Sequence, residues 1–400
     1  MRPVTTQTLP RTTTGWVDLA LSGPRPEQTP IVVTAIYRLW LVAFVLKMLG
    51  STWDMSWHFM WLRDTAAPPH ILNTIGTVMV VAMVIYQARF SVGVDKLAKR
   101  LMVFGTGMFL IAIPIDILNH EINGLDITAW SASHALLYLG TAFMLLGCAR
   151  GYWISTPPGR TRTIVSAVLW GFFLENVLFP SQHQEYGQLS LEAWQSGTPT
   201  AERSLLEFAA GQIGRSVDEV AVRGFALPVG DWVYPAWMAG AALLTLVAAR
   251  LFVGARWTAS AIAAGYLAYR MLAWILLVGS GFPPSYPPFL LLAGAVMIDL
   301  VFLAFTAVSG RGKFLVPHPV SAVPAPVGSA LTPHRSSVFR LVLAALVGAV
   351  VATGAIAAAS WVQGLVIGAP PIDYPAFAFG AVALAAGWLM LTLTALPKSD

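Results

Sequence analysis

The chain has 400 residues, of which 56% are hydrophobic and 11% charged, and its formal net charge is +5. A soluble globular protein carries about a quarter charged residues, so this composition excludes a chain that faces water all round. The 24 Lys and Arg are dispersed between apolar segments, which argues against nucleic-acid binding, and the single cysteine, Cys148, excludes an internal disulfide or a thiolate metal cluster.

Apolar segments of roughly 20 residues, the length that crosses a bilayer, recur along the whole chain. Lipid offers no partner to unpaired backbone groups, so each such segment must be a helix. We therefore predict an all-α polytopic membrane bundle of about ten transmembrane helices. They are placed near 32–56, 70–90, 101–120, 132–150, 163–179, 232–253, 257–280, 287–309, 338–361 and 374–396.

Composition also divides the chain into segments. Residues 1–30 are a polar, Thr- and Pro-rich tail, which we expect in the cytoplasm. Residues 31–309 form an eight-span membrane domain whose longest outer loop is 180–231. A cytoplasmic linker at 310–337, rich in Pro, Ser, Ala and Val, precedes a two-span C-terminal hairpin at 338–400.

Lys and Arg gather at every second connection and near both ends of the chain. Basic residues mark cytoplasmic connections, so we predict a bacterial-type plasma (inner) membrane protein with both termini in the cytoplasm. Within the long outer loop, an amphipathic stretch is expected to lie as a helix on the membrane surface. Its apolar residues are Leu205, Phe208, Ile213, Val217 and Val220.

Four of the seven histidines belong to two copies of one motif. The copies are Asp54-Met-Ser-Trp-His58 with Asp64, His70 and Gly76, and Asp116-Ile-Leu-Asn-His120 with Asp126, His134 and Gly140. The spacings from the first Asp to the first His, from that His to the second Asp, and from the second His to Gly are identical in both copies. Such a repeat indicates duplicated helical hairpins, formed by spans 1–2 and 3–4.

Residues four apart share a helix face, so Asp54 and His58 project together from the outer end of the first span, and His70 opens the second. Two imidazoles and a carboxylate are a sufficient ligand set for copper, zinc or non-haem iron. Two alternatives remain: these groups cap helices at the water boundary, or they line a proton or solute pathway. The predicted metal ligands are Asp54, His58, His70, Asp116, His120 and His134, oriented by Arg63, Asp64 and Asp126.

The first copy resembles the C subunit of particulate methane monooxygenase and ammonia monooxygenase. The resemblance rests on Trp53-Asp54-Met55-Ser56-Trp57-His58, Arg63-Asp64-Thr65 and Pro68-Pro69-His70. That family also carries an Asn-x3-His-x13-His set, which Asp116, His120 and His134 match with Asp in place of Asn. The similarity covers residues 50–145 and implies two adjacent copper sites.

Other polar groups within the spans have structural or functional interpretations. Arg270 and Asp299 are predicted to form a buried ion pair that fixes two helices, with a functional relay as the alternative. His183 is a candidate extra ligand, although an ordinary loop histidine is the alternative. Lys47, on the same face of the first span as Asp54, either balances the carboxylates or extends its ammonium to the interface.

These observations favour a copper-binding membrane protein, with zinc or iron as the less favoured metals. If it is catalytic, the resemblance implies O2-dependent hydroxylation of a small apolar substrate or ammonia, together with other membrane subunits. The alternatives are a copper-handling or accessory protein without turnover, and a transporter that uses the Asp/His cluster as its pathway. The sequence assigns no catalytic residue.

Overall fold

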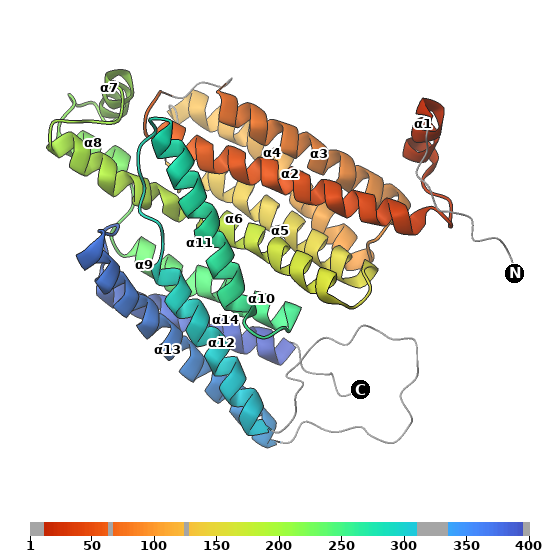
Figure 1. Cartoon of the computed structure of the whole chain (residues 1–400). Coiled ribbons are helices and arrows are strands. Elements are labelled where there is room, and N and C mark those ends of the chain that lie inside the picture. Colours follow the sequence, from red (N-terminus) through yellow and green to blue (C-terminus); the bar gives the residue numbers. More distant parts are fainter. Residues whose placement is uncertain (1–11, 63–66, 124–127, 310–334, 395–400) are drawn as a thin grey trace, which may run out of the picture. The chain divides into compact units, whose positions relative to one another are not determined.

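The computed structural model describes residues 12–62, 67–123, 128–309 and 335–394, with side chains except at 120–123, 306–309 and 335–338. The described residues form helices and connecting segments, with no β-strand among them (Figure 1). The predicted all-α class is therefore confirmed. The first six helices are α1 (Thr13–Ser22), α2 (Thr29–His58), α3 (Pro68–Phe90), α4 (Lys96–Asn123), α5 (Ala132–Ser155) and α6 (Arg160–Gln195).

Two short helices follow, α7 (Arg203–Gln212) and α8 (Glu219–Ala226). The next helix is continuous but contains one π-helical turn. Its three parts are α9 (Val233–Trp237), the π-helical turn η1 (Met238–Ala242) and α10 (Leu243–Val253). The last elements are α11 (Thr258–Gly279), α12 (Leu290–Ser309), α13 (Arg335–Val366), the 3-10 turn η2 (Tyr374–Ala376) and α14 (Phe377–Thr394).

Nine helices in the described part of the chain are long and apolar enough to cross a membrane. They correspond to α2 through α6, the α9–η1–α10 helix, α11, α13 and α14. α12 is also apolar but is shorter over its fully described portion, Leu290–Phe305. A bilayer environment follows from these helices, while the total of ten spans stays a prediction.

The fifth span is longer than expected. α6 continues without a break to Gln195, although Pro180 lies inside it. Proline removes one backbone donor, and a helix tolerates this where nearby polar groups satisfy the backbone. In the turn that precedes the proline, the Trp237 indole nitrogen donates to the Val177 carbonyl at 2.8 Å, and the Ser181 hydroxyl donates to the Leu178 carbonyl at 2.6 Å. The segment 180–195, which was expected to begin an outer loop, is therefore helical.

The chain divides into two compact units. The first comprises residues 1–54, 63–126 and 131–172, and the second comprises 55–62, 127–130 and 173–400. In the first unit α4 packs along α5 and against α3. In the second, α13 packs between α12 and α14, and α14 contacts the π-helical turn η1.

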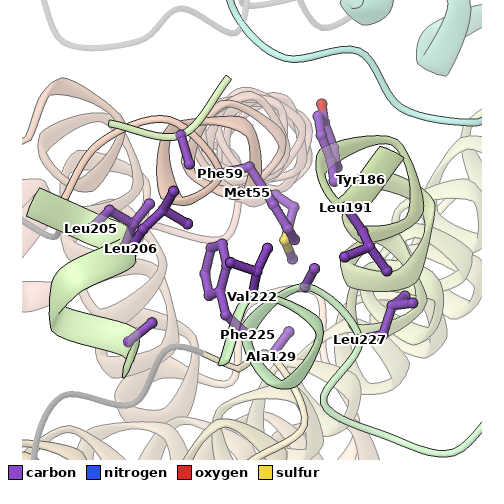
Figure 2. Close-up of a cluster of buried hydrophobic side chains, with 13 residues drawn as sticks. Met55, Phe59, Ala129, Tyr186, Leu191, Leu205, Leu206, Val222, Phe225 and Leu227 are labelled. Atoms are coloured by element: carbon purple, nitrogen blue, oxygen red, sulfur yellow. The ribbon is translucent and has the colours of Figure 1, made fainter. Parts of the chain in front are cut away.

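A hydrophobic cluster in the second unit includes residues from the last turn of α2, the end of α6, and α7 and α8 (Figure 2). The Phe59 side chain is only 1% exposed. Its ring is stacked on the Tyr186 ring and tilted against the Phe225 ring. Leu205 is also buried in this cluster, whereas Ile213 and Val220 are exposed. The amphipathic stretch therefore buries part of its apolar side against protein, not only against a membrane surface.

Candidate metal centre

The end of α2 carries the first two motif residues. Asp54 precedes His58, the last residue of α2, by one helical turn, so both side chains project from the same face. The next helix begins where the sequence predicts. Pro68 and Pro69 occupy the first positions of α3, where a missing backbone donor costs nothing, and His70 follows in the first turn.

Asp54 and His70 come together in the structure. Their Oδ1 and Nε2 atoms lie 2.8 Å apart, and both side chains are about one-fifth exposed, at 20% and 21%. Adding His58 gives a group in which one donor atom from each residue lies within 4.8 Å of the others.

The donor set fits a transition-metal ion. Bonds of about 2.0–2.2 Å to a tetrahedral ion place ligand atoms roughly 3.3–3.6 Å apart. The three donor atoms lie within 4.8 Å of one another. Side-chain rotations that move each atom by roughly 1 Å bring them to that arrangement. The 2.8 Å contact between Asp54 and His70 has the length of a hydrogen bond, so a metal would replace a shared proton there.

A buried ammonium lies deeper on the same helix. Lys47 is 8% exposed, and its Nζ donates to Asn73 Oδ1 at 2.9 Å and to Thr77 Oγ1 at 2.8 Å. The same Nζ lies 4.5 Å from the centre of the Phe109 ring. Lys47 therefore neither extends to the interface nor contacts Asp54 directly.

The second motif copy places its residues in a similar way. His134 lies in the first turn of α5, and its Nε2 is 4.0 Å from Asp116 Oδ1. The Ser131 hydroxyl caps α5 by accepting from the His134 backbone amide and lies 3.0 Å from the ring Nδ1. A partner at one ring nitrogen fixes the orientation of the other, which here is directed at the carboxylate.

The remaining predicted residues of these two sites fall outside the described portion. This applies to Arg63, Asp64 and Asp126, and to the side chain of His120. The expected opposition of His58 and His120, and the expected roles of Arg63, Asp64 and Asp126, therefore stay predictions.

His183 occupies a largely apolar place in the second unit. It is 3% exposed, and its Nε2 lies 3.0 Å from the Phe225 carbonyl oxygen. Its ring packs edge-on against Phe59. Nε2 thus already has a backbone contact, and the metal-ligand hypothesis for His183 gains no support from this geometry.

The predicted ion pair between Arg270 and Asp299 is wrong, because each residue has another partner. Arg270 pairs with Glu185 of α6 at 2.8 Å, with both side chains almost fully buried. Asp299 pairs with Arg250 of α10 at 3.0 Å. It also accepts from the backbone amide and hydroxyl of Ser260, each at 2.8 Å, near the start of α11.

A polar run in α6 was expected at the outer end of the fifth span and in the loop beyond it, whereas the structure places all of it within the helix. The side chains from Ser181 to Glu185 are all buried, and Gln182 donates to Glu175 at 2.9 Å. Tyr234 contacts Glu185 at 3.3 Å, and Tyr266 contacts Arg270 at 3.1 Å. The available signal was Arg270 itself, because a lone Arg within an apolar span requires a carboxylate partner from another element.

No protein-family model, curated protein or solved structure significantly matches this chain.

Proposed function

We propose that this chain is a multi-pass membrane protein that binds a transition-metal ion at Asp54, His58 and His70. The observation that carries the proposal is the gathering of one carboxylate and two imidazoles within 4.8 Å, at the end of one apolar helix and the start of the next. Ionisable groups in such helices are costly unless they serve a site.

We propose further that α4 and α5 repeat the arrangement of α2 and α3. Gly76 of α3 lies so close to α2 that an added Cβ would meet the Ala43 carbonyl oxygen at 2.8 Å. In the second copy, a Cβ on Gly140 of α5 would meet the Gly105 carbonyl oxygen of α4, also at 2.8 Å. Gly105 is the counterpart of Ala43 in the repeat, so equivalent helix pairs make equivalent contacts.

This correspondence extends to the motif residues. Asp116 and His134 occupy the places of Asp54 and His70 and lie 4.0 Å apart instead of 2.8 Å. Lys47 and Phe109, which are equivalent in the repeat, contact each other, as residues near an internal two-fold axis would. We therefore assign a second metal position to Asp116, His120 and His134.

The proposed metal is copper. Imidazole and carboxylate ligands do not by themselves separate copper from zinc or iron, although intrinsic affinities favour copper. The resemblance to the monooxygenase C subunit selects copper and implies O2-dependent hydroxylation with partner subunits. A bound copper ion would supply O2 binding and activation, while Asp54 and His70 would hold or release a proton as the ion leaves or enters.

The distribution of basic residues supports an extracytoplasmic location for the site. Arg89, Lys96, Lys99 and Arg100 lie at the ends of α3 and α4 opposite to the motif residues. The positive-inside rule assigns that end to the cytoplasm. Both proposed metal positions then face the periplasm of a bacterial-type inner membrane.

The proposal is tested by elemental analysis of protein purified in detergent without added metal. Copper should be present, and His70→Ala should lose the copper of the first position because the variant removes a ligand from the gathered group. His334→Ala, in the 310–337 linker, is the control and should retain the wild-type copper content. Folded wild-type protein without transition metal, or unchanged content in His70→Ala, would refute the metal site and favour the transporter interpretation.

A further inference from the structure

The most unusual charge in the first unit is Lys47. It lies within a membrane-spanning helix at 8% exposure, where an ammonium group is expensive to bury. Within the described part of the chain, no carboxylate lies close enough to Lys47 to form an ion pair. The structure therefore buries the Lys47 amino group without a carboxylate partner, and this cost calls for a function.

The surroundings of Lys47 form a specific cradle. Asn73 and Thr77 accept its hydrogen bonds, and the face of the Phe109 ring lies 4.5 Å from its Nζ. Ring faces attract cations through their quadrupole. Gly76 makes room for the side chain, since a Cβ there would lie 2.7 Å from Lys47 Cγ.

The cradle exists in one half of the repeat only. The counterpart of Lys47 in the second copy is Phe109, and the counterpart of Asn73 is Leu137. Gly76 and Gly140 match in both halves, so helix packing alone does not require the lysine. The lysine is thus present in one copy of the repeat only.

Lys47 lies two helical turns below Asp54 on the same face of α2, about 10 Å along the axis. A unit charge at this distance acts on a bound ion even without contact, because the intervening medium is protein and lipid. Without metal, Lys47 and Asp54 balance each other. With metal bound, the Lys47 charge repels the ion, and the repulsion energy is twice as large for a divalent ion as for a monovalent one.

We propose that Lys47 sets the charge preference of the Asp54, His58 and His70 site and favours a monovalent metal ion over a divalent one. This inference rests on the proposed metal site and adds the oxidation state that the site selects. Lys47 acts through the field it exerts on the ligands and the ion, so it is a positioning charge and not a ligand.

The size of the effect follows from Coulomb's law. At about 10 Å and an effective dielectric constant of about 20, one unit charge changes the affinity for a monovalent ion by roughly tenfold. The change for a divalent ion is then the square of that factor, roughly a hundredfold. A loss of packing or folding would have no reason to obey this relation.

The test measures the affinity of detergent-purified protein for Ag+, a redox-inert substitute for Cu+, and for Zn2+. The variant is Lys47→Met, which keeps the length of the side chain but removes the charge. His134→Ala is present in every sample, including the reference protein, so that the second position loses an imidazole ligand and contributes less. We expect Lys47→Met to bind Ag+ roughly tenfold more tightly and Zn2+ roughly a hundredfold more tightly.

Thr77→Val is the matched control, because it removes one hydrogen bond of the cradle and retains the charge. It should leave the ratio of Zn2+ to Ag+ affinity within about twofold of the reference. If Lys47→Met does not fold, Lys47→Gln tests the same loss of charge with a polar side chain that Asn73 and Thr77 can still contact.

The outcomes separate this inference from the proposed function. Binding of both ions by the reference protein, with equal shifts for both in Lys47→Met, would overturn the charge preference and leave the metal site intact. An unchanged affinity ratio in a folded Lys47→Met variant would do the same. Failure of the reference protein to bind either ion would overturn the metal site itself.

Discussion

At the residue scale, Asp95 shows how one carboxylate can serve two elements. Its Oδ1 accepts from the Ala98 backbone amide at 2.8 Å, in the first turn of α4. The same carboxylate forms a two-pronged contact with Arg150 of α5, whose Nη2 lies 2.6 Å from Oδ2. The hydrogen bonds and charge of Arg150 lower the pKa of Asp95 below its usual value.

Asp95→Asn should therefore destabilise the protein in a pH-dependent way. A depressed carboxylate pKa stabilises the folded state above the unfolded pKa near 3.9, and this contribution is lost as pH falls through the folded pKa. Since Asp95 and Arg150 are 35% and 40% exposed, we expect a loss of only about 0.5–1 kcal/mol at pH 7. Thermal unfolding in detergent at pH 7 and at decreasing pH measures the difference.

Asp95→Ala provides the comparison, because it also removes the helix cap that asparagine can maintain. It should cost a further amount of about 1 kcal/mol that persists at low pH. Equal stability of Asp95→Asn and wild type at pH 7 would show that the ion pair contributes nothing.

Individual residues also show how far the sequence predicts the site. Asp54, His58 and His70 are separated by short, regular spacings, so helix periodicity and one turn suffice to predict that they gather. The partner of Arg270 could not be predicted in this way. Glu185 lies on another helix and 85 residues away, so no local spacing in the sequence relates the two residues.

At the element scale, the ion pair between Glu185 of α6 and Arg270 of α11 makes a quantitative prediction. Arg270→Met leaves the Glu185 carboxylate buried without its guanidinium partner and should cost about 3–5 kcal/mol. Adding Glu185→Gln removes the uncompensated charge and should restore much of the loss. Thermal unfolding of the two single variants and the double variant measures their coupling.

An exposed pair provides the reference for this experiment. Arg203 and Glu207 lie four residues apart on α7, and the Arg203 side chain is 90% exposed. Arg203→Ala should change the stability by less than about 0.5 kcal/mol. Additive costs for Arg270→Met and Glu185→Gln would show that the buried pair does not act as a unit.

The elements that sequence patterns predicted best are those with uniform apolar composition, such as α3 and α11. α6 was predicted only in part, because its outer half is polar and begins with Pro180. Polar residues normally indicate a loop, but here Glu175, Gln182 and Glu185 bond to other buried groups. A period-based prediction detects the apolar face of a helix and cannot detect a polar side that tertiary contacts bury.

At the scale of the whole molecule, membrane orientation can be tested independently of the metal. Reporter fusions after Asp400 and within residues 90–100 should both report the cytoplasm, because Lys and Arg mark those regions as internal. A fusion in the exposed turn at Gly197 should report the periplasm. Opposite signals from the first two fusions would require an odd number of spans between them. A periplasmic signal from the fusion within residues 90–100 would place the motif on the cytoplasmic face.

Among the described helices α6 is the longest, and it extends well beyond the thickness of a membrane core. Its 36 residues measure about 54 Å, whereas the hydrocarbon core of a bilayer is about 30 Å thick. Helices within lipid associate by close packing without help from water, but apolar groups beyond it are driven together by water. One end of α6 is thus stabilised by packing in lipid and the other by the hydrophobic effect in water. Urea should weaken the cluster around Tyr186 and Leu191. A change in bilayer thickness should affect the other end of α6.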